Sequence, residues 1–183
     1  MYAVEVTLRE VQPRVWRAFV VPSDITLPPL HLVLQAVMGW ENHHLHAFRL
    51  GDQAFGPPDP DLDIEDERRV RLDDLLVRVG QSIRYEYDFG DDWQHDLVLK
   101  AIGGTAGDEG SIFVVGGEGA CPPEDVGGVP GYADYVAAIT DPSHEEHAAM
   151  IEWRGSGFDP NKFDVRAVNA ELERVGRRPK RQT

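Results

Sequence analysis

The segment Tyr85–Asp96 constrains the fold of this chain more than any other, because it places an acidic turn between two strand-like runs. Gly90 and the aspartates around it are typical turn residues, whereas the aromatic and branched residues on either side favour extended backbone. We therefore predict an antiparallel hairpin over residues 83–102, with its turn within Phe89–Trp93.

The turn of this hairpin contains more ionisable side chains than a turn requires. Asp88, Asp91, Asp92 and His95 lie within a short stretch that also contains Trp93 and other large aromatic residues. A neighbouring carboxylate can tune a histidine for acid–base work, so His95 and Asp92 are candidate catalytic residues. The structural alternative is a turn in which aspartates accept backbone N–H groups and Trp93 packs beneath. We also name Asp88, Asp91 and Trp93 as candidate binding residues.

A second segment, residues 116–128, combines glycines with two prolines and two acidic residues. Prolines restrict the backbone, so we expect an irregular loop that is held in one shape. Cys121 is a candidate catalytic nucleophile if the fold brings a histidine beside it, and otherwise a small buried apolar residue. Glu124 and Asp125 are candidate binding residues that can also cap the turn into Gly127.

Three histidines, His43, His44 and His46, lie where we expect a helix to give way to a strand. On a strand, His44 and His46 share one face. Nitrogen and oxygen ligands of this kind suit zinc or another divalent metal, so the candidate metal ligands are His44, His46, His95 and Asp91. The alternative is that some of these histidines form hydrogen bonds in the core while others lie at the surface.

The chain is strongly acidic, with a formal net charge of −14. Residues 171–183 carry a net charge of +3, so the rest of the chain carries −17. Such a field repels phosphate backbones, so we expect no binding to nucleic acid, and it favours a basic protein or peptide as partner. The basic residues 173–183 are interpreted as a tail that caps a helix C-terminus or frays, with contact to nucleic acid or an acidic partner as the alternative.

The sequence also bears on location. The N-terminal residues have neither the basic stretch nor the apolar core of a signal peptide, and no apolar run is long enough to span a membrane. A single cysteine allows no internal disulfide, as is typical of a reducing cytosol. We therefore expect a cytoplasmic protein without a membrane segment.

Periodicity predicts the other elements. Alternating apolar residues predict a strand over residues 2–8, and further strands are expected over residues 14–21, 46–50 and 111–115. Helices are predicted over residues 28–38, 71–76, 132–139, 143–153 and 164–175, with Pro28 and Gly39 bounding the first and with Ser143 and Asp164 capping the last two. We expect an exposed loop over residues 51–66, a flexible acidic turn over 103–110 and irregular backbone over 116–131.

This order of elements predicts an α+β fold with a single domain. We expect a β-grasp-like mixed sheet, helices packed on it and a helical C-terminal extension. The domain is predicted to cover residues 1–172, followed by the basic tail over residues 173–183.

Several sequence blocks, in this order, resemble one family: Val15-Trp16-Arg17, Met38-Gly39-Trp40, His44 to Phe48, Tyr87 to Asp91, Cys121 to Gly128, Asp141-Pro142 and Phe158-Asp159-Pro160. The chain resembles, over about residues 2–172, the root-inducing-plasmid ORF-three-like family, also called insertion-element passenger TnpR-like proteins. The resemblance implies an association with plasmids and mobile elements. It also implies further cysteines in many members, at positions that are Val114 and Val126 here.

The resemblance does not bring a reaction with it. The TnpR label suggests a resolvase, but no serine of this chain lies in an arginine-rich setting and the net charge has the wrong sign for DNA. Two classes of function remain: a protein or ligand binding module, and a metal-dependent hydrolase that uses clustered histidines and aspartates. In both cases we expect the acidic hairpin, residues 43–46 and residues 121–128 to meet, with His95 and Asp91 or Asp92 lining the cleft.

Overall fold

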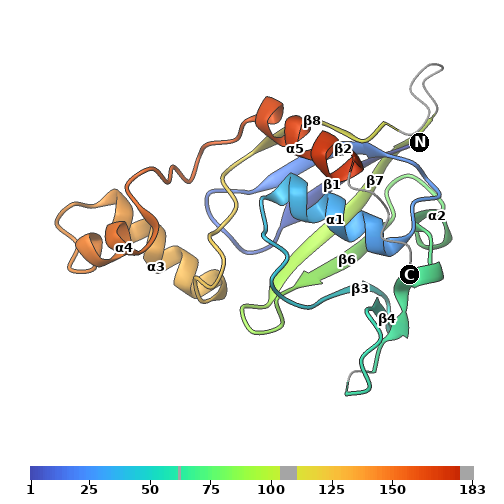
Figure 1. Ribbon diagram of the computed structural model, residues 1–183, viewed down its shortest axis with the longest axis horizontal. Coiled ribbons are helices and arrows are strands. Elements are labelled where there is room, and N and C mark those ends of the chain that lie inside the picture. The colour runs from blue at the N-terminus through green and yellow to red at the C-terminus, as the bar shows by residue number, and fades with distance from the viewer. Residues whose placement is uncertain (62, 104–110, 178–183) are drawn as a thin grey trace.

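The computed structural model describes residues 1–61, 63–103 and 111–177, and one eight-stranded sheet forms its centre (Figure 1). The strand order is β5-β4-β3-β6-β7-β1-β2-β8. All neighbouring strands are antiparallel except β4 and β5, which run parallel. The prediction of an α+β fold with one mixed sheet and helices packed on it is therefore confirmed.

The centre of the sheet consists of two hairpins that the sequence predicted. Strands β1 (Tyr2–Leu8) and β2 (Trp16–Val21) form the first, and β6 (Ser82–Tyr87) and β7 (Trp93–Ile102) form the second. Buried and partly exposed residues alternate along each of these strands, as expected when one face of a sheet covers the core. The turn of the second hairpin lies at residues 89–92, as predicted.

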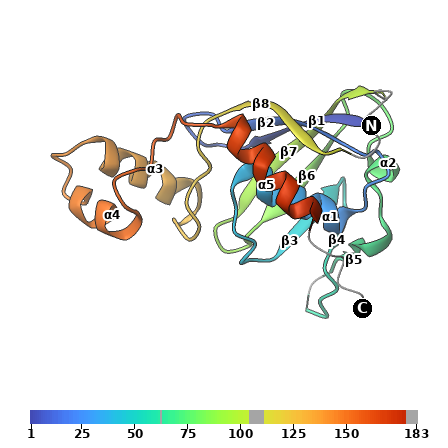
Figure 2. The ribbon, with the colours of Figure 1, turned by 45° about the horizontal axis from the view of Figure 1, so that its top comes forward.

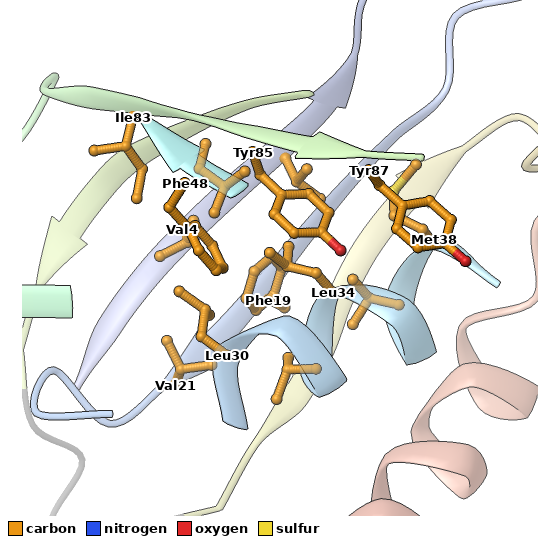
Figure 3. Close-up of a cluster of buried hydrophobic side chains, with 14 of the residues drawn as sticks. Val4, Phe19, Val21, Leu30, Leu34, Met38, Phe48, Ile83, Tyr85 and Tyr87 are labelled. Carbon is orange, nitrogen blue, oxygen red and sulfur yellow. The ribbon is translucent and has the colours of Figure 1, made fainter. Parts of the chain in front are cut away.

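Helix α1 (Leu27–Met38) covers the buried face of the sheet. It has proline in its first turn and ends at Gly39, whose φ of 103° is the left-handed conformation that glycine adopts most easily. Figure 3 shows Leu30 and Leu34 of α1 close to Phe19, with Tyr85 projecting from β6 toward the helix. This contact forms the hydrophobic core.

Helix α5 (Val165–Arg177) packs beside α1 and β8 (Phe113–Glu118). The side chain of Asp164 accepts hydrogen bonds from the N–H groups of Arg166 and Ala167, which confirms the predicted cap. The side chain of Asn169 forms two hydrogen bonds with the backbone N–H and carbonyl of Val114. Helix α5 therefore satisfies backbone groups at the outer edge of β8.

Helices α3 (Gly128–Thr140) and α4 (His147–Arg154) form a lobe at one end of the molecule, away from α1 and α5 (Figures 1 and 2). The start of α3 contacts the turn of the β6–β7 hairpin, because the backbone N–H of Gly127 donates to Asp91 Oδ2 at 3.0 Å. This contact joins the lobe to the sheet beside the predicted site.

Three local predictions are wrong. Residues 51–66 are not one loop, because a tight turn at Gly51 and Asp52 leads into β4 (Gln53–Gly56), and β5 (Glu65–Asp66) follows. Residues 116–131 are not wholly irregular, because β8 extends to Glu118 and α3 begins at Gly128. Ser143 does not cap α4; its hydroxyl donates to Asp141, and α4 begins only at His147.

The remaining elements connect these layers. β3 (His46–Leu50) pairs with β4 and β6, while the short helices η1 (Glu67–Arg69) and α2 (Leu72–Leu75) join β5 to β6. The predicted acidic turn lies almost wholly outside the described residues, as do residues 178–183 of the predicted tail; its residues 173–177 belong to α5. No helix of the described chain is long and apolar enough to cross a membrane.

Candidate metal centre

The three segments that the sequence analysis singled out meet at the hairpin turn. His44 Nε2 lies 3.6 Å from Asp88 Oδ2, 3.7 Å from Glu124 Oε2 and 3.1 Å from Asp125 Oδ1. His44 precedes β3, Asp88 follows β6, and the two acidic residues precede α3. The predicted meeting of these segments is therefore confirmed, and its centre is His44.

The backbone of the turn positions Asp88. Its φ of 55° is uncommon outside glycine but is tolerated by aspartate, and its N–H donates to the carbonyl of Leu45 at 2.9 Å. Asp88 Oδ1 accepts the N–H of Gly90 at 2.9 Å. One carboxylate oxygen thus holds the turn, while Oδ2 faces His44.

Glu124 is 5% exposed and is held by one oxygen only. Its Oε1 accepts hydrogen bonds from the hydroxyl of Tyr87 at 2.9 Å and from the N–H of Glu41 at 2.7 Å. Its Oε2 is buried and has no hydrogen-bond partner among the described residues. A buried carboxylate oxygen without a hydrogen-bond partner is costly, and this oxygen faces His44 Nε2 at 3.7 Å.

His44 also has a buried polar atom without a hydrogen-bond partner. Its ring packs edge-on to Tyr87 at a centroid distance of 5.9 Å, and its Nε2 is buried. Three carboxylates lie nearby, yet none of them accepts a hydrogen bond from this nitrogen within the described structure. Two buried polar atoms, His44 Nε2 and Glu124 Oε2, therefore face each other unsatisfied.

The spacing of these atoms matches a metal coordination shell. In a tetrahedral site with bonds of about 2.1 Å, neighbouring ligand atoms lie about 3.4 Å apart. The three distances from His44 Nε2 lie on either side of that value, at 3.1 to 3.7 Å. The ligand atoms of His44, Asp88 and Asp125 lie within 4.8 Å of one another. These three residues could hold a divalent cation, and Glu124 Oε2 lies beside them, 3.7 Å from His44 Nε2.

Asp91 has a different role from the metal ligand that was predicted. Its Oδ2 accepts the N–H of Gly127. Its carbonyl oxygen would lie only 2.6 Å from a Cβ added at Gly128, which is too close for any side chain. Gly128 has a φ of 68°. Asp91 therefore joins the hairpin turn to the start of α3, and only glycine at position 128 permits this approach.

His46 lies outside the centre, contrary to the prediction. It stacks on His31 with ring centroids 3.6 Å apart, and its Nε2 is bonded to Glu67 at 3.0 Å. Burial chiefly, and then His46, lower the pKa of His31 to about 3. The pair belongs to the core between α1 and β3.

His95 is likewise a core residue rather than a catalytic or metal-binding one. It is fully buried, its Nδ1 lies near the carbonyls of Tyr85 and Trp93, and its Nε2 accepts from the indole of Trp40 at 3.3 Å. Burial lowers its pKa to about 4, so it is neutral at physiological pH. A convergence of His44, His46 and His95, which would have favoured the metal-dependent hydrolase, is not found among the described residues.

The other candidate residues also lie outside the candidate metal centre. Asp92 is exposed and bonds to Gln94, and Trp93 is fully buried in the core. Burial raises the pKa of the Cys121 thiol well above its usual range, although Arg17 acts in the opposite direction. A thiol of this kind is a poor nucleophile. The candidate catalytic set His95, Asp92 and Cys121 is therefore not brought together.

Comparisons with known proteins place the chain among relatives. A family model described as "Plasmid pRiA4b ORF-3-like protein" matches residues 1–167. The chain is 44% identical over 169 residues to the uncharacterized protein y4hQ of Sinorhizobium fredii (strain NBRC 101917 / NGR234), a match that covers 91% of this chain and 84% of that protein. Its structure is similar to the crystal structure of MM3350 from Methanosarcina mazei Go1, a protein of unknown function, with a TM-score of 0.81, 32% identity and coverage of 90% and 95% of the two chains.

Proposed function

Because the chain belongs to the plasmid pRiA4b ORF-3-like family, whose relatives above have no stated activity, we propose a function from its geometry: a binding module organised by a divalent cation. The proposed ligands are His44 Nε2, Asp88 Oδ2, Glu124 Oε2 and Asp125 Oδ1. The α3–α4 lobe is the part of the module that the cation holds in place.

The observation that carries this proposal is the unsatisfied oxygen of Glu124. Glu124 Oε1 has two donors, so the side chain cannot turn to satisfy Oε2 without losing them. A protonated His44 offers the simplest alternative, because it pairs with carboxylates. These contacts have ion-pair distances of 3.1 to 3.7 Å, and metal titration separates such a pair from a bound cation. A cation between these atoms satisfies all of them.

The ligand set indicates the class of ion. Carboxylate oxygens suit magnesium, calcium and manganese, whereas imidazole suits zinc, iron, nickel and copper. One imidazole with three carboxylates combines both preferences, so Mn²⁺ and Zn²⁺ are the ions to test. Their charge compensates most of the negative charge that the three carboxylates bring together.

The position of the centre suggests what the ion does. Glu124 and Asp125 lie a few residues before α3, while His44 and Asp88 belong to the sheet side of the contact. A bound ion therefore adds a further attachment to those that Asp91 makes with Gly127 and that Glu124 makes with Tyr87 and Glu41. The lobe then keeps one orientation, which a binding surface requires.

Isothermal titration of untagged, chelator-treated protein with Mn²⁺ and Zn²⁺ tests the proposal. We expect one site per chain, and we expect Glu124→Gln to weaken binding by at least about tenfold, since even loss of an outer-shell partner costs about 10- to 100-fold. Asp92→Asn is the matched control, because Asp92 lies in the same turn but outside the centre. Equal affinity in the wild type and Glu124→Gln, or no binding of either ion, contradicts the proposal.

A further inference from the structure

The α3–α4 lobe contains a pocket of about 470 Å³ that none of the preceding roles uses. Its walls are formed by residues of both helices and of the loop before α3, among them Tyr135, Met150 and Trp153. A volume of this size is ordinary for a site that binds a small ligand or one side chain. Asp125 also lines the pocket, so the pocket lies directly beside the candidate metal centre.

The apolar part of the pocket is aromatic and only partly covered. Tyr135 is 1% exposed and packs edge-on to Trp153, with ring centroids 5.8 Å apart. Trp153 is 44% exposed, and no residue of α4 is buried. A large exposed indole beside a hollow is a common feature of ligand sites, because it offers apolar area at low entropic cost.

The polar part of the pocket is acidic. Asp125, Asp134 and Glu146 line it, and neither Asp134 nor Glu146 pairs with a lysine or arginine in the part of the chain described. Arg154 lies over Trp153 at 4.6 Å and donates to the carbonyl of Glu124, so it already has partners. His144 accepts the N–H of Glu146 at Nδ1. The pocket therefore carries a net negative charge.

We propose that this pocket binds an arginine side chain of a basic peptide. The aliphatic stem of arginine packs on Met150 and the aromatic wall, and its guanidinium reaches the carboxylates of Asp134 and Glu146. Arginine is favoured over lysine because its planar group is weakly hydrated, stacks on aromatic rings and pairs with two oxygens at once. The charge of −17 outside residues 171–183 attracts such a peptide from a distance.

This inference goes beyond the metal centre and does not depend on it, because Asp134 and Glu146 are not among the proposed metal ligands. Asp125 belongs to both sites. Experiments in the presence of a chelator therefore test the pocket alone, and a failure here leaves the metal proposal untouched.

Titration of isotope-labelled protein by NMR, in chelator, distinguishes the chemistry that is bound. The probes are acetyl-Gly-Arg-Gly-amide and the same peptide with citrulline, which has the same shape but no charge. We expect saturable shifts of the Trp153 indole N–H with the arginine peptide and binding about tenfold weaker with citrulline, since charge-assisted hydrogen bonds are about twice as strong as neutral ones. Equal binding of the two peptides, or no saturable shift at Trp153, overturns the proposal.

Two double variants separate the pocket from the overall charge. Asp134→Asn with Glu146→Gln removes two charges from the pocket, and we expect arginine affinity to fall by at least about fivefold. Glu145→Gln with Glu152→Gln removes two charges from the same lobe at exposed positions that do not line the pocket. We expect the second pair to bind as the wild type does. An equal loss in both pairs overturns the proposal.

Discussion

The hydroxyl of Tyr87 donates a 2.9 Å hydrogen bond to Glu124 Oε1, which joins the last residue of β6 to the loop before α3. Tyr87 is fully buried, and burial, followed by the neighbouring Glu124 carboxylate, raises its pKa well above the usual range. The hydroxyl therefore keeps its proton and remains a hydrogen-bond donor. It fixes one oxygen of Glu124 and thereby directs the other at His44.

Tyr87→Phe is expected to weaken metal binding more than it weakens the fold. Glu124 Oε1 keeps the N–H of Glu41, so the loss of one buried hydrogen bond costs about 1 kcal/mol of unfolding free energy. Metal affinity should fall by about tenfold, because the carboxylate loses an orienting partner. Titration calorimetry and urea denaturation of the same preparation measure the two effects. An unchanged metal affinity would show that Tyr87 does not orient the ligand.

Metal is expected to raise the thermal stability of the wild type and to leave His44→Ala unchanged. A ligand present at about 100 times its dissociation constant adds about 2.7 kcal/mol to the free energy of unfolding. Scanning calorimetry with Mn²⁺ or Zn²⁺, followed by excess chelator, measures this gain and its reversal. A similar gain in His44→Ala would place the bound ion elsewhere on the chain.

Stability is expected to fall between about pH 6.5 and pH 4.5. The pKa values of His31 and His95 are lowered to about 3 and about 4 in the folded protein, chiefly by burial. In the unfolded chain both titrate near the ordinary value of about 6.5. Within this window the unfolded state therefore binds more protons than the folded state. The stability that the neutral histidines contribute is present above pH 6.5 and is lost as the pH falls.

Each of these histidines contributes a slope of up to about 1.4 kcal/mol per pH unit. Urea denaturation at several pH values between 7 and 4.5 measures the combined slope. His95→Gln should show a smaller slope than the wild type, whatever its stability at pH 7, because glutamine does not titrate. A slope that is identical in wild type and variant would contradict the assignment of a lowered pKa to His95.

Gly128→Ala is expected to destabilise the protein by about 1–3 kcal/mol. The φ of 68° disfavours alanine, and the added Cβ would lie 2.6 Å from the carbonyl oxygen of Asp91. Gly157→Ala is the matched control, because a Cβ at Gly157 meets no atom within 4 Å. We expect the control to change the free energy of unfolding by less than about 0.5 kcal/mol. Chemical denaturation of both variants makes the comparison, and equal effects would refute the proposed close contact.

Local sequence patterns predicted most of the strands and helices near this site. Alternation predicted β1, the aromatic runs around the Gly-Asp turn predicted the central hairpin, and proline and glycine marked both ends of α1. These signals act over a few residues, so one sequence is enough to detect them. The failures have local causes as well. The turn at Gly51-Asp52 joins β3 to β4, but it lies in a segment rich in proline and aspartate, a composition that favours a loop.

The role of His95 was also open to prediction from the sequence, but only by applying the two-residue period of a strand. Once Trp93 is assigned to the core, His95 must point the same way, while Asp92 and Gln94 point outward. The burial pattern of β7 follows this rule. His95 is close to the turn carboxylates in sequence, but its side chain is buried in the core whereas that of Asp92 is exposed.

The sequence by itself determined the family, the α+β class and the three segments whose composition marks the site. Only the tertiary structure decided which side chains of those segments meet. Residues such as Tyr87 and Glu124 are 37 positions apart, and no local preference specifies their contact. Packing of α1 on the sheet and of α3 against the hairpin turn places them, and the same packing leaves Glu124 Oε2 and His44 Nε2 without partners. An unsatisfied buried atom is a property of the assembled fold, because it depends on every neighbour that the chain does or does not supply.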